Sequence, residues 1–244
     1  MANLTGPERA RYVQEMFTRI APRYDLMNRL MTLGQDVSWR REVVRRAGLA
    51  PGARLLDLGA GTGDLARDVV QACPDCMAVA ADFTLGMMLA GRARIGEAHT
   101  NSRRLLWSGA DALHLPFPAG TFDAVISGFL MRNVIDLPRA LLEQGRVLKQ
   151  GGRIIILDTT RPPENVLSPL LRIHLNVVIP NLGRIVTGEG DAYRYLPQTT
   201  SGFLQAEQLA AQMVRAGFHQ VGFRRLMFGT VAIHWGVLPA LRAA

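Results

Sequence analysis

The sequence contains a single lysine, Lys149, two cysteines and only 7% aromatic residues in its 244 positions. No uninterrupted apolar run reaches the roughly 18 residues that a transmembrane helix requires. The first residues lack the basic start and apolar stretch of a signal peptide. We therefore expect a cytoplasmic protein.

The two cysteines, Cys73 and Cys76, flank a Pro-Asp pair, a spacing found in redox pairs and in one half of a zinc site. Zinc needs two further ligands at comparable local spacing, and the five histidines are scattered singly along the chain. We expect a structural turn between a helix and a strand here, and no metal site.

Positive charge is in excess, with a formal net charge of +8, and it is almost entirely arginine. Arg40, Arg41, Arg45 and Arg46 can share one face of a helix. Two interpretations remain open, namely solvated helix faces and attraction to an anionic membrane surface. Because no aromatic platform for single strands and no DNA-reading helix accompanies the charge, we do not expect nucleic acid as a partner.

An apolar fraction of 48% with 20% charged residues is typical of a globular chain with a sizeable core. Helical apolar spacing precedes residue 50, and short apolar runs then alternate with amphipathic stretches. This alternation predicts an α/β fold that is Rossmann-like, with a mostly parallel seven-stranded sheet, helices on both faces and a terminal hairpin. The expected helices are 7–20, 22–33, 38–47, 64–72, 84–95, 137–149 and 206–216, and the expected strands are 54–57, 77–81, 104–107, 124–126, 153–158, 221–226 and 230–237.

A glycine-rich turn, DLGAGTG at residues 57–63, follows the first predicted strand. Its Gly-x-Gly-x-Gly spacing lets the backbone approach a ligand and differs from the Gly-x-Gly-x-x-Gly of dinucleotide sites. Asp82 ends the second strand, where a carboxylate can accept both hydroxyls of a ribose, and Asp111 follows the third, where it can accept an adenine amino group. Each aspartate alone is equally a helix cap or turn former, but three in register predict a site for S-adenosylmethionine.

The predicted residues contact different parts of S-adenosylmethionine. Asp57 faces the cationic amino-acid portion through a backbone or water contact, Thr62 supplies a hydroxyl, and Ala112 offers a backbone N–H to the adenine ring. The cofactor-binding residues predicted from this part of the chain are Asp57, Gly59, Gly61, Thr62, Gly63, Asp82, Phe83, Asp111 and Ala112.

Four further segments are more specific: YDLMNRLM at 24–31, MRNV at 131–134, RVLKQGGR at 146–153 and DAYRYL at 191–196. With them the chain closely resembles the ubiquinone/menaquinone biosynthesis C-methyltransferases of the UbiE/MenG type. The resemblance implies a class I methyltransferase that methylates a ring carbon of a prenylated quinol and releases S-adenosylhomocysteine. It also implies peripheral association with an anionic membrane, because the substrate resides there.

Ring methylation requires an electron-rich aromatic carbon, which loss of a proton from the adjacent hydroxyl provides. We predict that Arg132 stabilises the resulting phenolate, directly or through an ordered water, and that Asn133 orients the hydroxyl. In the family's pattern a cofactor-contacting serine falls on Gly128, with Ser127 one place earlier, and both are predicted to bind the cofactor. The predicted substrate-binding residues, for which core packing is the alternative, are Tyr24, Met27, Tyr193 and Tyr195.

We interpret residues 1–244 as one domain. It comprises a helical cap at 1–50, a cofactor-binding core at 51–160, a lid or substrate segment at 161–204, and a C-terminal helix and β-hairpin at 205–244. The segment 161–204 is long for a connection and apolar, which indicates either a lid over an apolar substrate or an amphipathic helix that caps the sheet.

The chain departs from the family's pattern at several positions: Asp36 replaces a histidine, Gln150 a proline, Asp111 an asparagine, and Asp158-Thr159-Thr160 a Glu-x-Ser. The acceptor therefore stays open between a naphthoquinol, a benzoquinol and another aromatic small molecule. A silent cofactor-binding scaffold is the alternative from another class, although its marks, a broken glycine turn or a lost Asp82, are missing. The oligomeric state is also open, a homodimer included.

Overall fold

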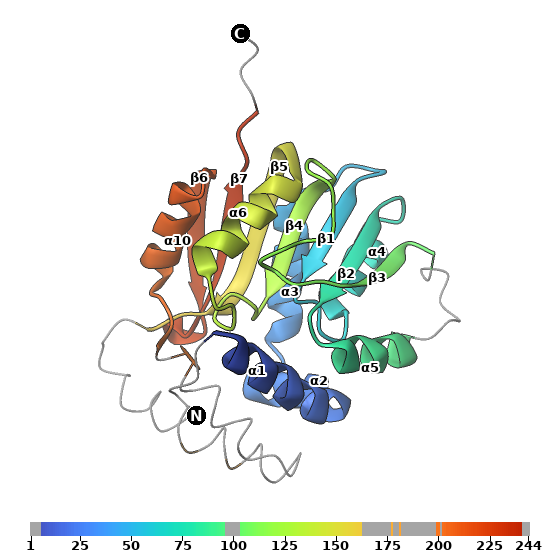
Figure 1. Cartoon of the computed structure of the whole chain (residues 1–244), viewed down its shortest axis with the longest axis vertical. Coiled ribbons are helices and arrows are strands. Elements are labelled where there is room, and N and C mark those ends of the chain that lie inside the picture. Colours follow the sequence, from blue (N-terminus) through green and yellow to red (C-terminus); the bar gives the residue numbers. More distant parts are fainter. Residues whose placement is uncertain are drawn as a thin grey trace.

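The computed structural model describes residues 6–95, 103–162, 177, 181, 199–200 and 202–240. Within them one seven-stranded sheet has the order β3-β2-β1-β4-β5-β7-β6, with helices on both faces (Figure 1). Its strands are β1 (Arg54–Leu58), β2 (Met77–Asp82), β3 (Leu105–Gly109), β4 (Phe122–Gly128), β5 (Leu148–Thr159), β6 (His219–Leu226) and β7 (Val231–Val237). The α/β fold expected from the alternating pattern is thereby confirmed.

The strands β1 to β5 pair with one another in parallel, whereas β7 runs antiparallel to both β5 and β6. Parallel strands end at one edge of the sheet, so the loops after β1, β2, β3 and β4 come together there. That edge is where an open α/β sheet binds its ligands.

The two faces of the sheet are covered by different helices because neighbouring residues of a strand point to opposite sides. Leu55 packs with α3 (Asp36–Ala47) and α4 (Asp64–Ala72), and Leu56 packs with α6 (Leu137–Val147) and α10 (Ala206–Arg215). Helix α5 (Leu85–Ile95) follows β2.

Three N-terminal elements lie at the carboxyl edge of the sheet (Figure 1): α1 (Gly6–Ile20), the 3-10 turn η1 (Ala21–Arg23) and α2 (Tyr24–Met31). They have a small core of their own, made by Met16, Ile20 and Met27. Helix α1 also packs closely on α5, since a Cβ at Gly86 would lie 2.8 Å from Cγ2 of Thr18.

The expected elements all occur, with differences at their ends. The helix expected at 22–33 is divided into η1 and α2, and α3 begins two residues before its expected start. The prediction that a helix continues to Lys149 was wrong, because α6 ends at Val147 and Leu148 already pairs with Phe122 of β4. Sheet pairing prevails over helical periodicity there, and Gly151 takes a φ of 76° within the strand.

Cys73 and Cys76 form a disulfide, with their Cα atoms 5.3 Å apart, in the connection between α4 and β2. The predicted position between a helix and a strand is confirmed. None of the described helices is long and apolar enough to cross a membrane. Most of the segment expected to be a lid, 161–204, lies outside the described residues.

Candidate active site

The loop after β1 requires glycine at three positions. Gly59, Gly61 and Gly63 have φ values of 71°, 56° and 78°, in the left-handed region that favours glycine. Side chains would also collide, since a Cβ at Gly59 would lie 2.9 Å from the side chain of Leu130 and one at Gly63 2.5 Å from Trp107. The loop therefore presents bare backbone to the carboxyl edge of the sheet.

Asp82, the last residue of β2, holds this loop from the neighbouring strand. Its carboxylate accepts hydrogen bonds from the backbone N–H groups of Gly61 (2.8 Å) and Thr84 (2.6 Å). Burial raises the pKa of Asp82, although these bonds oppose the shift. The side chain lies in the wall of a cavity, where one carboxylate can serve both the loop and a ligand.

Asp57 lies beneath the loop and is fully buried. Its Oδ2 accepts a hydrogen bond of 2.9 Å from the N–H of Ala66 in α4, whereas its Oδ1 has no hydrogen-bond partner in the described part of the chain. Burial raises the pKa of Asp57 to about 8. A cationic group placed beside Oδ1 would oppose this shift and satisfy the atom.

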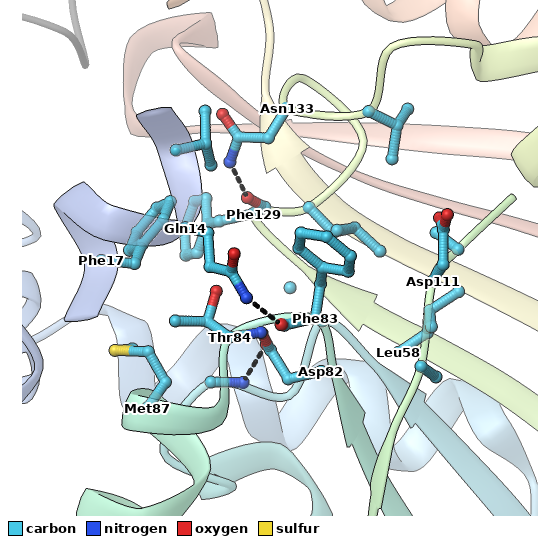
Figure 2. Close-up of a pocket in the computed structure, with 18 of the residues that line it drawn as sticks. Gln14, Phe17, Leu58, Asp82, Phe83, Thr84, Met87, Asp111, Phe129 and Asn133 are labelled. Atoms are coloured by element: carbon cyan, nitrogen blue, oxygen red, sulfur yellow. Dashed lines mark hydrogen bonds between the residues drawn. The ribbon is translucent and has the colours of Figure 1, made fainter. Parts of the chain in front are cut away.

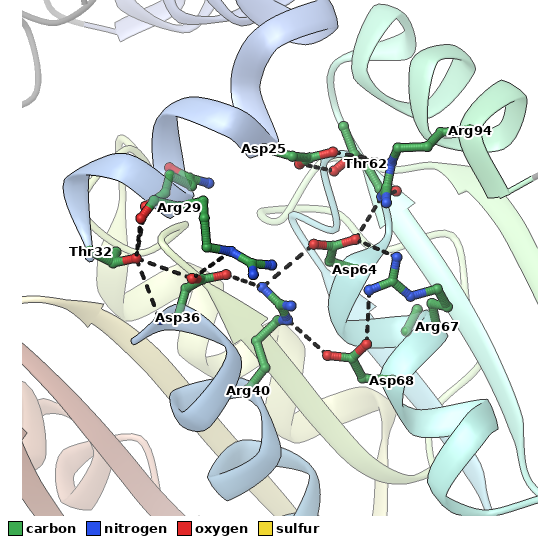
Figure 3. Close-up of polar contacts among 12 residues, drawn as sticks. Asp25, Arg29, Thr32, Asp36, Arg40, Thr62, Asp64, Arg67, Asp68 and Arg94 are labelled. Atoms are coloured by element: carbon green, nitrogen blue, oxygen red, sulfur yellow. Dashed lines mark hydrogen bonds and ion pairs between the residues drawn. The ribbon is translucent and has the colours of Figure 1, made fainter. Parts of the chain in front are cut away.

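The loop is also bonded to the N-terminal helices through Thr62. Its hydroxyl donates to Oδ1 of Asp25 in α2 over 2.7 Å, within a larger group of ion pairs (Figure 3). The hydroxyl predicted to contact the cofactor thus has a protein partner here.

Gly59 and Gly61 of the loop help to line a cavity with about 940 Å³ of empty space, its open mouth included. Figure 2 shows side chains of its wall. One part of its wall is polar and carries Asp82 and Asp111. Another part is apolar and includes Phe17, Val134 and Ile135. A second cavity of about 670 Å³ adjoins it, and the two share the wall residues Tyr24, Gly59, Gly61, Gly128 and Phe129.

Phe129, directly after β4, has a φ of 58°, which is uncommon for an aromatic residue. Its carbonyl accepts a 3.2 Å hydrogen bond from Nδ2 of Asn133, and both residues line the first cavity (Figure 2). This turn places Asn133 beside the apolar wall. Strained backbone of this kind is often found at functional sites.

Arg132 lies behind this wall in a buried ion pair. Its Nη1 is 2.7 Å from Oδ1 of Asp158, and the side chains are 3% and 0% exposed. The backbone N–H of Arg132 bonds the other carboxylate oxygen over 3.3 Å, and its guanidinium lies 5.1 Å from the centre of the Phe129 ring. Its Nε has no hydrogen-bond partner among the described residues.

A sequence model of the ubiE/COQ5 methyltransferase family matches residues 5–238. The chain belongs to this family. It is therefore an S-adenosylmethionine-dependent methyltransferase, and the resemblance inferred from the four sequence segments is confirmed.

Two relatives of this ubiE/COQ5 family member are similar over most of the chain. The chain is 44% identical to a demethylmenaquinone methyltransferase of Thermus thermophilus, with 92% of this chain and all of the relative covered. It is 42% identical to a ubiquinone/menaquinone biosynthesis C-methyltransferase of Desulfotalea psychrophila, over 92% of this chain and 89% of the relative.

Solved structures share the fold at much lower identity. The [4+2]-cyclase SpnF superposes with a TM-score of 0.64 at 18% identity, over 83% of this chain and 80% of that one. Haemonchus contortus phosphoethanolamine N-methyltransferase 2, solved with S-adenosyl-L-methionine, has a TM-score of 0.64 at 15% identity, over 83% and 52% of the two chains. These likenesses concern the fold.

The structure of this ubiE/COQ5 family member brings most predicted site residues to the two cavities. Lining the first are Tyr24, Gly59, Gly61, Asp82, Phe83, Asp111, Ala112, Gly128 and Asn133. Asp57 and Thr62 line the second cavity. Gly63, Ser127, Arg132 and Met27 are not in the lining of either cavity, and Tyr193 and Tyr195 lie outside the described residues.

Sequence reasoning missed the residues that α1 contributes. Val13, Gln14 and Phe17 line the first cavity, and Nε2 of Gln14 donates to the carbonyl of Phe83 over 3.0 Å (Figure 2). No motif marks these positions. The available signal was helical spacing, which puts residues 13 and 17 on one face of α1.

Proposed function

We propose that this chain methylates a ring carbon of a prenylated quinol, with demethylmenaquinol as the first candidate acceptor. Its relatives named as demethylmenaquinone methyltransferases support this choice, one of them at 44% identity over its full length. The observation that carries the proposal is the first cavity, whose lining combines the aspartates of the proposed cofactor site with an apolar wall. The cationic nucleoside of the cofactor needs the carboxylates, and an aromatic ring with a prenyl tail needs the apolar wall.

Two observations support S-adenosylmethionine as the group held at the glycine loop. The bare backbone at Gly59 and Gly61 leaves room that side chains would fill, because a Cβ at Gly61 would lie 3.2 Å from Cε of Met87. The buried Oδ1 of Asp57, unpartnered among the described residues, suits a cationic ammonium group. When bound, S-adenosylmethionine supplies an electrophilic methyl group on a sulfonium.

The residues of the chain would bind and orient the two reactants. Asp82 would accept the ribose hydroxyls, and Asp111 with the backbone of Ala112 would hold the adenine. Asn133 in the apolar wall would orient the quinol hydroxyl next to the methylated carbon. Loss of the hydroxyl proton to solvent makes that carbon nucleophilic, and the guanidinium of Arg132, paired with Asp158 behind Phe129, would stabilise the phenolate. The ring proton at the methylated carbon would then be lost to solvent.

Tyr24 would contribute as a neutral wall residue between the two cavities. Burial raises the pKa of its phenol, so the hydroxyl stays protonated at neutral pH. It can therefore donate a hydrogen bond but does not act as a base.

Peripheral association with anionic lipid, which we also propose, would bring the enzyme to an acceptor that resides in a membrane.

The test is transfer of a labelled methyl group from S-adenosylmethionine to reduced demethylmenaquinone with a short prenyl tail. A demethylated benzoquinol serves as the comparison acceptor. We expect ring-methylated product with the wild type and none with Asp82→Ala. Arg132→Met should lower kcat about 100-fold through the lost electrostatic stabilisation.

Breaking the buried pair also costs roughly 3–5 kcal/mol of stability, so activity alone is ambiguous. The double variant Arg132→Met/Asp158→Asn removes both charges, and we expect it to regain stability without regaining turnover. Wild-type turnover by that double variant would exclude a role for Arg132. Cofactor binding without transfer to either quinol would favour another aromatic acceptor or a silent scaffold.

A further inference from the structure

Asp25 belongs to the YDLMN segment at the start of α2, and the proposed chemistry gives it no role. Its two carboxylate oxygens have different partners (Figure 3). Oδ1 accepts the hydrogen bond from the hydroxyl of Thr62, at 2.7 Å, and Oδ2 lies 3.1 Å from Nε of Arg94 in α5. One side chain therefore joins α2, the glycine loop and α5.

Thr62 is held from the opposite side as well. Nη2 of Arg94 donates to the carbonyl of Thr62 over 3.2 Å. At Gly91 of α5 a Cβ would lie 2.4 Å from the same carbonyl oxygen, so the helix backbone contacts the loop directly. Thr62 is thus enclosed between α5 and Asp25.

The position of Thr62 determines that of its neighbours in the loop. Gly61 donates to Asp82 over 2.8 Å, and Gly63 leaves room for Trp107. A displacement at residue 62 would disturb the backbone proposed to hold the cofactor. Residue 24, the chain neighbour of Asp25, is the tyrosine whose side chain lines both cavities.

We propose that Asp25 is a positioning residue with two effects. Through Thr62 it fixes the glycine loop for S-adenosylmethionine, and through the start of α2 it fixes Tyr24 in the wall between the cavities. The first effect rests on the proposed cofactor site alone, and the second also rests on the proposed quinol pocket.

Further ion pairs join Arg94 of α5 to helices α4 and α3. Nη2 of Arg94 lies 2.6 Å from Oδ1 of Asp64, whose other oxygen is 3.5 Å from Nη1 of Arg40 (Figure 3). Arg40 in turn pairs with Asp68 of α4 at 2.8 Å. Arg94 therefore stays anchored when Asp25 is changed, so Asp25 variants should test a local link.

The experiment compares variants that differ by single groups. Thr62→Val removes the donor at nearly constant volume, and Thr62→Ser keeps it. Asp25→Ala removes both links of the carboxylate, and Asp25→Asn keeps only an acceptor for Thr62. Glu15→Ala, at an exposed carboxylate of α1, is the matched control.

The dissociation constant of S-adenosylhomocysteine is measured by calorimetry, and KM and kcat by the methyl-transfer assay. Thr62→Val should raise the dissociation constant and KM for the cofactor about tenfold, with Thr62→Ser less affected and Glu15→Ala near wild type. Asp25→Ala should do the same and also raise KM for the quinol, with Asp25→Asn less affected. Because both act through one hydrogen bond, adding Thr62→Val to Asp25→Ala should weaken cofactor binding no further.

A merely structural role would lower kcat with the folded fraction and leave KM unchanged. If folded Thr62→Val and Asp25→Ala bind the cofactor with unchanged affinity, the effect on the glycine loop is overturned. If Asp25→Ala has an unchanged KM for the quinol, the effect on Tyr24 is overturned. Thr62→Val still decides the loop effect if Asp25→Ala does not fold. Calorimetry needs no acceptor, so a wrong quinol assignment leaves the loop test intact.

Discussion

At the scale of single residues, the protonation state of Asp57 links the proposed cofactor site to stability. Its pKa is raised to about 8 by burial, against an ordinary value of 3.8. The folded protein therefore holds a proton at pH 7 that the unfolded chain releases. The stability contribution of this proton is fully present below about pH 4 and is lost as the pH rises through about 8.

We expect Asp57→Asn to remove this pH dependence, because the amide stays neutral. The free energy of unfolding, measured by urea titration between pH 5 and pH 8, should fall more in the wild type than in the variant. Binding of cationic S-adenosylmethionine should release a proton from the wild type at pH 7, since the ligand favours the carboxylate. Equal slopes for the two proteins would show that Asp57 is already ionised without ligand.

At the scale of elements, helix α6 holds the loop after β3 from outside the cavity. Glu143 accepts a 2.9 Å hydrogen bond from the N–H of Leu115, and Arg146 donates to the carbonyls of Leu115 (2.9 Å) and Phe117 (2.8 Å). The Arg146 guanidinium, hydrogen-bonded to Glu143, lowers the pKa of the Glu143 carboxyl to about 2. The same loop begins with Asp111 and Ala112 of the first cavity.

Glu143→Ala should therefore loosen the proposed adenine-binding loop. We expect KM for S-adenosylmethionine to rise about tenfold with little change in kcat, since one charge-assisted bond is lost. Because the lowered pKa keeps Glu143 ionised well below neutrality, the effect should be constant from pH 5 to pH 9. Glu207→Ala, which removes a Glu–Arg pair between α10 and Arg225 of β6, is the matched control. A fall in kcat at unchanged KM would contradict this role.

At the scale of the whole molecule, three exposed leucines lie on α2 and directly after it. Leu26 and Leu30 lie one turn apart on α2, and Leu33 follows the helix with a φ of 52°; the three are 53%, 37% and 76% exposed. The chain carries a net charge of +8. An apolar helix face on a basic protein is suited to an anionic lipid surface.

We expect the protein to co-sediment with vesicles that contain phosphatidylglycerol and to bind phosphatidylcholine vesicles weakly. Added salt should reduce binding by screening the charges. Leu33→Ser should weaken partitioning about tenfold, in line with the loss of one inserted leucine. Leu142→Ser, at an α6 leucine 53% exposed, should have no effect, and equal losses in both variants would exclude α2 as the docking face.

The sequence predicted the sheet and the cofactor loop because both depend on local patterns. Alternating apolar runs, three glycines and aspartates in register at successive strand ends were sufficient to predict that Asp82 and Asp111 lie at one site, and both line the first cavity. The predictions were wrong where pairing between residues far apart in the sequence decided the structure, as at the end of α6. The role of Thr62 was likewise not predictable, since its partner Asp25 lies 37 positions away.

The amino-acid sequence by itself determined the α/β architecture, the carboxyl edge of the sheet as the proposed binding edge and the family. These follow from residue type and spacing, which act over a few neighbouring positions. Only the tertiary structure decided that Arg132 pairs with Asp158 behind the cavity wall, that α1 lines the pocket and that Asp25 is joined to the glycine loop. Such contacts depend on how packed elements bring distant side chains within hydrogen-bonding distance, and no local pattern encodes that distance.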